Sequence, residues 1–155
     1  MFPTHFELNP KAVITGLAIP DKRRLLDFVA ARAAEVYDIP ADSARKAIED
    51  RESLGSTGVG GGIATPHGRM PIVHRPVALL IRLDPPIDYD AVDGAVVDIV
   101  FALLSPEHSG AIHLHALAEI SRMLRDDKMQ AKLRGAVDAD ALFAVVTGGN
   151  ERNAA

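Results

Sequence analysis

The 155-residue sequence contains no cysteine. It therefore has no disulfide framework, no thiolate nucleophile and no Cys-based zinc or iron–sulfur site. Positive charge is also in short supply, because 17 Lys and Arg stand against 21 Asp and Glu and give a formal net charge of −4. With no basic surplus to neutralise phosphates, we expect neither nucleic acid nor an acidic membrane surface as a general partner.

A long apolar run is missing as well. The longest one, AVVDIVFALL at 95–104, is too short to cross a bilayer and is interrupted by Asp98. The opening MFPTHFELNP lacks the basic start and the apolar run of a secretory signal. We therefore expect a cytoplasmic protein that does not insert directly into a membrane, folded as a single domain over residues 1–155.

Five segments have residue patterns typical of helices. They are 21–38, 42–53, 111–126, 127–135 and 138–146. Asp21 and Asp42 stand where side-chain caps of the first two helices are expected. The residues at the end of the chain, 148–155, are expected to form a frayed tail.

Strands are predicted between these helices. PVALLIRL (76–83) and AVVDIVFALL (95–104) are almost continuously apolar, as in strands that are covered on both faces. A brief strand is expected around Ile63, a break at the Asp-Pro-Pro of 84–86, and a loop over 105–110. Helices on both sides of buried strands predict a layered α/β domain.

The stretch RESLGSTGVGGGIATPHGR (51–69) has five glycines in eight positions. A P-loop is excluded, because that motif needs a lysine and none occurs between Lys46 and Lys128. A dinucleotide fingerprint also fails, because the loop runs from a helix into a strand and its glycine spacing differs. A nucleotide site is therefore not expected here.

Two interpretations of this loop stay open. The glycines form only a tight, irregular turn, or they cradle an anion. Ser56 and Thr57 offer hydroxyls, successive backbone N–H groups can form a nest, and Arg51 lies just upstream. Such donors suit a doubly charged phosphoryl group. The candidate phosphoryl-binding loop comprises Gly55, Ser56, Thr57, Gly58 and Gly60.

His67 closes this stretch and is the candidate nucleophile. Pro66 restricts the backbone before it and Gly68 leaves the position after it without a Cβ, so the ring is presented at a defined angle. A neutral imidazole is available as a nucleophile near the cytoplasmic pH, and attack on phosphorus gives a labile phosphohistidine. The alternative is a solvated histidine with no role.

A second histidine, His113, falls in the helix predicted at 111–126. It shares one helical stripe with Leu117, Ile120 and Leu124, so it faces the core. Spacing alone favours a core residue with one satisfied hydrogen bond over a partner of His67. His115 is rotated away from this stripe and is expected to face water.

Three stretches, RESLGSTGVGGGIATPHGR, VVDIVFALLSP and HLHALAEISRML, resemble in order and spacing the enzyme IIA domain of the fructose–mannitol class. This domain belongs to the bacterial phosphoenolpyruvate-dependent sugar phosphotransferase system. The resemblance runs from about Asp21 to about Thr147 and is to the stand-alone nitrogen-regulatory branch in particular. It implies a single-domain α/β sandwich in which a mixed β-sheet is flanked by helices on both faces.

The resemblance also implies roles for the candidate residues. His67 matches the family's phosphorylated histidine, which accepts a phosphoryl group from an HPr-like phosphocarrier protein. His113 matches the second active-site histidine, which supports the phosphorylated state, and this replaces its interpretation as a core residue only. Arg51 matches an arginine that neutralises phosphoryl charge, and Ser56 and Thr57 fall in the pocket wall. Neither a metal nor a cofactor is implied, because the intermediate is a covalent phosphohistidine.

Partners and output are implied in the same way. Without a cysteine or a membrane span, the chain contains neither the IIB nor the IIC function, so its output is expected through regulatory targets such as transporters or sensor kinases. A soluble IIA subunit that serves a separate IIB component of a sugar transporter stays open. So do a metal-dependent hydrolase that uses His67, His113 and a carboxylate, and a binding module in which His67 is never phosphorylated.

Overall fold

Strand β6 (Val97–Pro106) lies in the interior of a six-stranded mixed sheet in the computed structural model, which describes residues 5–148. The other strands are β1 (Glu7–Leu17), β2 (Gly58–Gly60), β3 (Ile63–Ala64), β4 (His67–Met70) and β5 (Val77–Ile87). Their order is β1-β5-β6-β3-β2, and β4 also pairs with β6. β6 is antiparallel to β5 and parallel to both β3 and β4, while β1 is parallel to β5. The sheet is therefore mixed.

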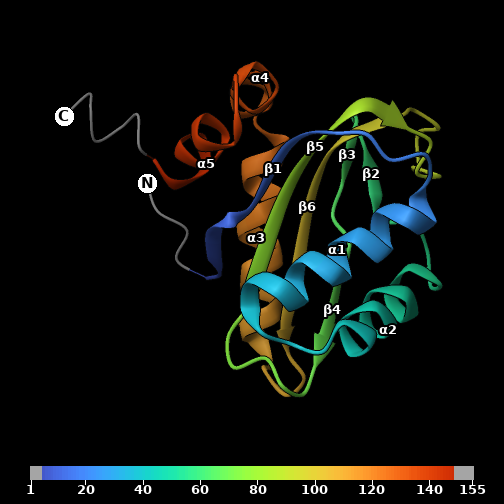
Figure 1. Cartoon of the computed structure of the whole chain (residues 1–155), viewed down its shortest axis with the longest axis vertical. Helices are drawn as coiled ribbons and strands as arrows, with labels where there is room; N and C mark the ends of the chain where they lie inside the picture. Colours follow the sequence, from blue (N-terminus) through green and yellow to red (C-terminus); the bar gives the residue numbers. More distant parts are fainter. Residues whose placement is uncertain (1–4, 149–155) are drawn as a thin grey trace.

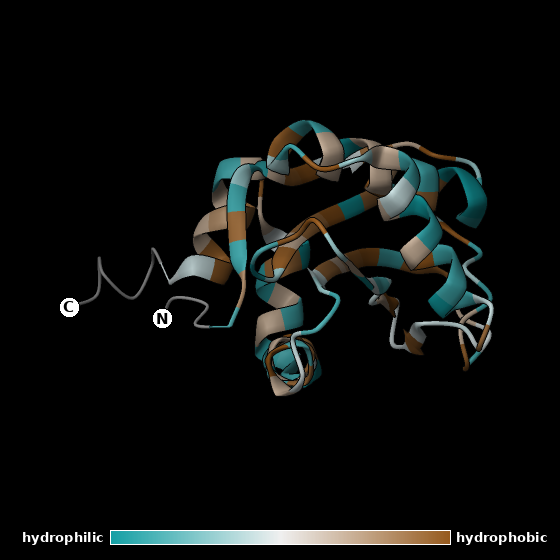
Figure 2. Ribbon diagram, turned by 90° about the horizontal axis from the view of Figure 1, so that it is seen from below, coloured by the Kyte–Doolittle hydropathy of each residue, from teal (hydrophilic) through white to brown (hydrophobic). Residues whose placement is uncertain are grey.

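Helices cover both faces of this sheet. α1 (Lys22–Tyr37) and α2 (Ala41–Glu52) lie on one face, and α3 (Ala111–Arg125) lies on the other (Figure 1). Figure 2 shows the sheet between these two layers, with apolar residues along its strands. α4 (Asp127–Gly135) and α5 (Ala139–Thr147) follow α3, and α5 packs against β1. The expected α/β sandwich with a mixed sheet is confirmed.

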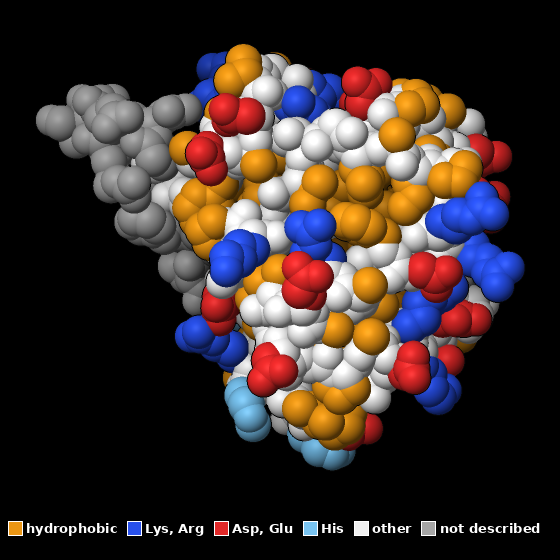
Figure 3. All heavy atoms as spheres, in the orientation of Figure 1, with side chains coloured by type: hydrophobic (Ala, Val, Ile, Leu, Met, Phe, Trp, Pro, Cys, Tyr) orange, Lys and Arg blue, Asp and Glu red, His pale blue; other side chains and the backbone are white. Residues whose placement is uncertain are grey.

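Charge on the face that carries α1 and α2 is mixed in sign. Figure 3 shows acidic and basic side chains interspersed there, with apolar side chains between them. Lys46, for example, pairs with Asp50 one turn further along α2, at 2.9 Å. This face therefore has no patch of one sign of the kind that attracts a polyanion. Within residues 5–148, no helix combines the length and the apolar character that a membrane span requires.

Two strand boundaries differ from the prediction, and three strands, β1, β2 and β4, were not predicted. β1 is an edge strand that pairs only with β5, through an irregular register, so its sequence ELNPKAVITGL tolerates proline and glycine and shows no clean alternation. β5 continues through the Asp-Pro-Pro of 84–86, where its register with β6 is also irregular. β6 extends into the predicted loop at 105–110 and so places Ser105 inside the sheet.

The helices begin and end close to the predicted positions. The Asp21 carboxylate accepts a hydrogen bond from the backbone of Arg24 and caps α1 as expected. The prediction for α2 is wrong in detail, because Pro40 takes the cap position and Asp42 lies in the first turn. Gly148 caps α5 in a left-handed conformation, whereas the rest of the predicted tail lies outside the described residues.

The glycine-rich loop folds into a small hairpin of β2 and β3. Gly60, Gly61 and Gly62 turn the chain with φ angles of +102°, +67° and +83°, a region that other residues rarely adopt. The Gly61 N–H donates to the Asp93 carboxylate at 3.0 Å, and the Gly61 carbonyl accepts from Arg134 at 2.8 Å. The glycines therefore serve a tight turn whose backbone groups are bound by neighbouring side chains.

Arg134 also pairs with Asp98, the one charged residue in β6. The distance between the Arg134 guanidinium and the Asp98 carboxylate is 2.9 Å. Asp98 lies near one end of β6 and is half-buried, so it reaches the side chain of α4 that crosses this end of the sheet.

Gly68 allows α2 to pack directly on β4. A Cβ at this position would lie 2.7 Å from the carbonyl carbon of Ala47 and 2.8 Å from its Cβ. Such distances are too short for real side chains, so only glycine fits here without a shift of the helix. The contact brings the last turn of α2, which carries Arg51, next to the strand that carries His67.

Gly68→Ala is expected to lower the free energy of unfolding by about 1–3 kcal/mol, because the added methyl group overlaps the backbone of α2. Chemical denaturation measures the change. Gly135→Ala is the matched control, since a Cβ there meets nothing within 4 Å, and it should change stability by less than about 1 kcal/mol. Equal stability of Gly68→Ala and the wild type would contradict the close packing of α2.

Candidate active site

His67 is the first residue of β4, where it lies opposite Leu103 of β6, and its imidazole is half-buried. Its Nδ1 lies 2.8 Å from the carbonyl oxygen of Thr65. A carbonyl oxygen only accepts hydrogen bonds, so Nδ1 carries the proton of the neutral ring and Nε2 keeps its lone pair. The Pro66 carbonyl accepts from the Leu103 N–H at 3.0 Å, which anchors the step before the ring to β6.

His113 lies in the first turn of α3 and is only 4% exposed. Its ring centroid is 5.5 Å from that of His67, with 47° between the two ring planes. Its Nδ1 lies 2.6 Å from the hydroxyl oxygen of Ser105. His113 is therefore a buried residue with one hydrogen bond, as its helical spacing predicts, and it also lies beside His67. His115 is exposed, as expected.

The two imidazoles lie in a cleft of about 450 Å³ where α2, β4 and α3 meet. Arg51 lines this cleft from the last turn of α2, and its Nη1 donates to the Gly55 carbonyl at 2.8 Å. His67, His113 and Arg51, which come from three separate segments, are thus brought together. The cleft is completed by Ala47, Asp50, Leu54, Gly68, Arg69, Leu114 and Leu117.

Arg69 is a cleft residue that the sequence analysis did not identify. It follows His67 by two positions in β4, and side chains two apart in a strand project from the same face. Its exposed guanidinium lies on the side of β4 that carries His67 and lines the same cleft. The two-residue spacing between His67 and Arg69 would have indicated this shared face, but only if a strand is assumed to begin at His67.

The environment of the two imidazoles keeps both of them neutral near pH 7. Burial is the main cause that lowers the pKa of His67, the hydrogen bond to Thr65 opposes it, and the positive charge of Arg51 adds to the decrease. Burial, with the charges of His67 and Arg69, lowers the pKa of His113 to about 4. A neutral imidazole with a free ring nitrogen is a competent nucleophile.

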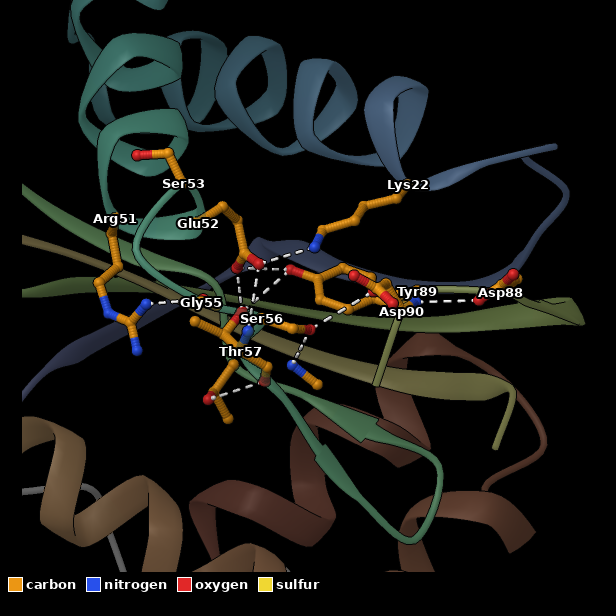
Figure 4. A network of polar contacts seen from close by, with 12 residues as sticks. Lys22, Arg51, Glu52, Ser53, Gly55, Ser56, Thr57, Asp88, Tyr89 and Asp90 are labelled. Atoms are coloured by element: carbon orange, nitrogen blue, oxygen red, sulfur yellow. Dashed lines mark hydrogen bonds and ion pairs between the residues drawn. The ribbon is translucent and has the colours of Figure 1, made fainter. Parts of the chain in front are cut away.

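The loop after α2 is held by the buried carboxylate of Glu52 (Figure 4). Glu52 accepts from the Thr57 N–H at 3.1 Å and from the Tyr89 hydroxyl at 2.9 Å, and it pairs with Lys22 at 2.9 Å. It also accepts from the Thr57 hydroxyl. Figure 4 shows the side chains of Arg51 and Glu52 leaving α2 in different directions, so one residue serves the cleft and the next one anchors the loop.

This network occupies donors that were expected to face a phosphoryl group. Thr57 is 2% exposed and bound to Glu52, and the Ser56 hydroxyl accepts from the Gly58 N–H at 3.1 Å. The Gly55 N–H donates to the Glu52 carbonyl at 3.1 Å. None of the described residues that line the cleft comes from Gly55 to Gly60. A phosphoryl-binding role for this loop therefore stays a prediction without support from its contacts, because the Glu52 carboxylate binds both donors of Thr57, and the Gly55 and Gly58 N–H groups are bound by the Glu52 carbonyl and the Ser56 hydroxyl.

The arrangement favours one class of chemistry over another. Among residues 5–148, no group of three or more His, Asp or Glu is placed to hold a metal ion, so the ligand set of the hydrolase alternative is not found there. The cleft instead combines a neutral imidazole with a free ring nitrogen, a second imidazole, two guanidinium groups and the Asp50 carboxylate, which pairs with Lys46. The second imidazole and the guanidinium groups stabilise a reacting centre that carries negative charge.

Known proteins with similar sequences belong to a phosphotransferase family. A family model described as "Phosphoenolpyruvate-dependent sugar phosphotransferase system, EIIA 2" matches residues 7–148. A nitrogen regulatory protein of Bradyrhizobium diazoefficiens is 43% identical over 137 residues, which cover 88% of this chain and 90% of that protein. The similarity therefore extends over almost the whole length of both chains.

Solved structures place the fold in the same group. The nitrogen regulatory protein IIA-Ntr from Neisseria meningitidis superposes with a TM-score of 0.83 at 28% identity, over 89% of this chain and 94% of that one. The complex of enzyme IIAMTL and phosphorylated enzyme IIBMTL from Escherichia coli gives a TM-score of 0.75 at 15% identity, over 92% and 99% of the two chains. The second likeness is one of fold alone.

An NMR titration of the His67 ring is expected to give a midpoint below the usual 6.5, because burial and Arg51 both disfavour the charged ring. The neutral form, and with it the nucleophile, should therefore persist below pH 6.5 and be lost only at more acidic pH. Arg51→Gln removes one of the causes and should raise the midpoint. A wild-type midpoint above 6.5 would contradict the site as described.

A second pH effect concerns Glu52. Burial acts to raise the pKa of Glu52, but hydrogen bonds from Thr57, Lys22 and Tyr89 outweigh it and lower the pKa below 4.5. Such a carboxylate stabilises the folded state above about pH 4.5, and the contribution is lost as the pH falls through its lower folded value.

Glu52→Gln is therefore expected to lower the free energy of unfolding at pH 7 by about 1–3 kcal/mol, and the difference from wild type should shrink below pH 4.5. Denaturation at several pH values measures both effects. Glu49→Gln is the control on the same helix, because its side chain is 64% exposed and its loss should cost less than about 1 kcal/mol. A difference that stays constant down to pH 3 would count against the network.

Proposed function

The chain belongs to the EIIA 2 family of the phosphoenolpyruvate-dependent sugar phosphotransferase system, and we propose that it acts there as a phosphohistidine relay. His67 is the acceptor, and the donor is a histidine-phosphorylated, HPr-like carrier protein. The observation that carries the proposal is the hydrogen bond from Nδ1 of His67 to Thr65, which leaves Nε2 of a neutral, half-buried ring as the free nucleophile.

In the transfer, Nε2 of His67 attacks phosphorus in line with the N–P bond of the donor. The new N–P bond forms as the old one breaks, and the electron pair of the old bond returns to the donor nitrogen, so no further reactant is consumed. Nδ1 keeps its proton and its hydrogen bond to Thr65 throughout. That bond stabilises the positive charge that the His67 ring gains when Nε2 is phosphorylated.

The other cleft residues act on the charge of the phosphoryl group. Its transition state spreads negative charge over the equatorial oxygens, so catalysis is mainly positioning and electrostatic stabilisation. We assign this role to the guanidinium groups of Arg51 and Arg69 and to the imidazole of His113, which all line the cleft with His67.

The surroundings of the cleft suit a protein donor. Leu54, which follows α2, and Leu114, which lies in α3, both line the cleft. Their side chains are 83% and 60% exposed. Exposed apolar side chains on both sides of a reacting group favour docking of a protein surface over binding of a free small phosphate alone.

The output we propose is regulatory. Phosphorylation adds about −1.5 to −2 charges in the middle of the docking surface, so a target that binds the bare surface is repelled by the phosphorylated one. The likeness to a nitrogen regulatory protein supports a regulatory role, and we expect targets such as transporters or sensor kinases. The alternative is a IIA subunit that passes its phosphoryl group to a separate IIB component of a sugar transporter, and label that moves onward to a IIB cysteine would favour it.

Incubation with phosphoenolpyruvate, enzyme I and the cognate carrier is expected to add one acid-labile phosphoryl group, which intact-mass spectrometry detects. His67→Ala should abolish it, and Arg51→Gln should slow it by about 10²- to 10³-fold through loss of charge stabilisation. His115→Ala is the matched control, because His115 is exposed on another side of α3.

Label that persists in His67→Ala would refute the assignment of the acceptor. An adduct that survives acid would exclude phosphohistidine altogether. A wild-type mass that never changes would favour a binding module in which His67 is not phosphorylated.

A further inference from the structure

Ser105 is a buried polar residue that the transfer chemistry does not yet use. It lies near the end of β6, is 0% exposed and follows directly on the apolar residues 99–104 of that strand. Its hydroxyl oxygen lies 2.6 Å from Nδ1 of His113, which lines the cleft. A hydroxyl in such a place needs a physical reason, because burying a polar group is costly unless it is hydrogen-bonded.

The direction of this hydrogen bond follows from where each proton can go. If Nδ1 of His113 donated, the Ser105 hydroxyl proton would need a second acceptor, and none is found for it among the described residues. A buried donor without a partner is unfavourable, whereas an unused lone pair on the same oxygen costs little. The arrangement that satisfies the hydroxyl is the one in which it donates to Nδ1.

We propose that Ser105 donates a hydrogen bond to Nδ1 of His113, fixes that ring as the Nε2–H tautomer, and so makes His113 a neutral hydrogen-bond donor for the phosphoryl group. Ser105 is then a positioning residue, since it acts through His113 and touches no reacting atom. The tautomer is a property of the unphosphorylated protein, and its use in transfer rests on the proposed function.

The two facing rings then have opposite tautomers, each set by one hydrogen bond. Thr65 accepts from Nδ1 of His67 and leaves Nε2 with a lone pair, while Ser105 donates to Nδ1 of His113 and leaves Nε2 with a proton. The ring centroids are only 5.5 Å apart. A nucleophile and a donor thus face the same cleft without either ring being charged, and the low pKa of His113 keeps its ring neutral at pH 7.

The test measures the tautomer and the transfer rate separately. Long-range ¹H–¹⁵N correlation of the unphosphorylated protein is expected to report a proton on Nε2 of His113 and a bare Nδ1. In Ser105→Ala, the His113 signals should move to a mixture of tautomers or to Nδ1–H. Phosphoryl transfer should slow by about 10- to 100-fold at saturating carrier, with little change in KM, the size of effect known for hydrogen-bond partners that orient metal-binding histidines.

Ser109→Ala is the matched control. Ser109 lies in the segment that connects β6 to α3, and its hydroxyl oxygen is also buried but has no hydrogen-bond partner. Its removal should therefore leave the His113 tautomer and the rate unchanged. A wild-type His113 with its proton on Nδ1 would overturn the proposal, even if Ser105→Ala failed to fold. So would a folded Ser105→Ala with the wild-type tautomer, or with the wild-type rate. A wild-type protein that is never phosphorylated would instead refute the relay, while the tautomer would still be decided by NMR.

Discussion

The hydrogen bond between Nδ1 of His67 and the carbonyl of Thr65 is the contact on which the proposed chemistry depends. It decides which ring nitrogen holds the proton, and therefore which one can attack. The two residues are separated only by Pro66, whose carbonyl is bound to β6. Because proline limits the backbone conformations between Thr65 and His67, the carbonyl oxygen stays within hydrogen-bond distance of the ring. The backbone conformation therefore selects the tautomer of His67.

Around that bond, β6 and α2 collect groups that are distant in sequence. β4, which begins at His67, pairs with β6, and Ser105 of β6 forms a hydrogen bond with His113. One strand therefore contacts the segments that hold both imidazoles. Gly68 lets α2 approach β4, and this approach brings Arg51 to the cleft. Glu52, the next residue along α2, anchors the following loop to Tyr89, so the helix end that presents the guanidinium is held on both sides.

Features with a strong local signal were predicted well. The apolar stripe of 111–126 correctly gave a helix with His113 on its buried side, and the almost continuous apolar runs correctly gave the two long strands. β1 was missed because an edge strand with one partner need not alternate. Arg69 was missed because its orientation depends on a four-residue strand that has no pattern of its own. The hydroxyls of the glycine-rich loop were interpreted by their chemistry, but the Thr57 hydroxyl is bound by the Glu52 carboxylate and the Ser56 hydroxyl accepts from the Gly58 N–H.

Periodicity and residue chemistry thus predicted the helices and the two long strands and pointed to His67 as the candidate nucleophile, since each of these rests on the identity and spacing of neighbours along the chain. The proximity of His67, His113, Arg51 and Ser105 comes only from the folded structure, because these residues lie in two strands and two helices whose packing no local pattern encodes. The same holds for the protonation of the rings. The neutral imidazole of an isolated peptide can carry its proton on either ring nitrogen, and its surroundings in the fold select one of them.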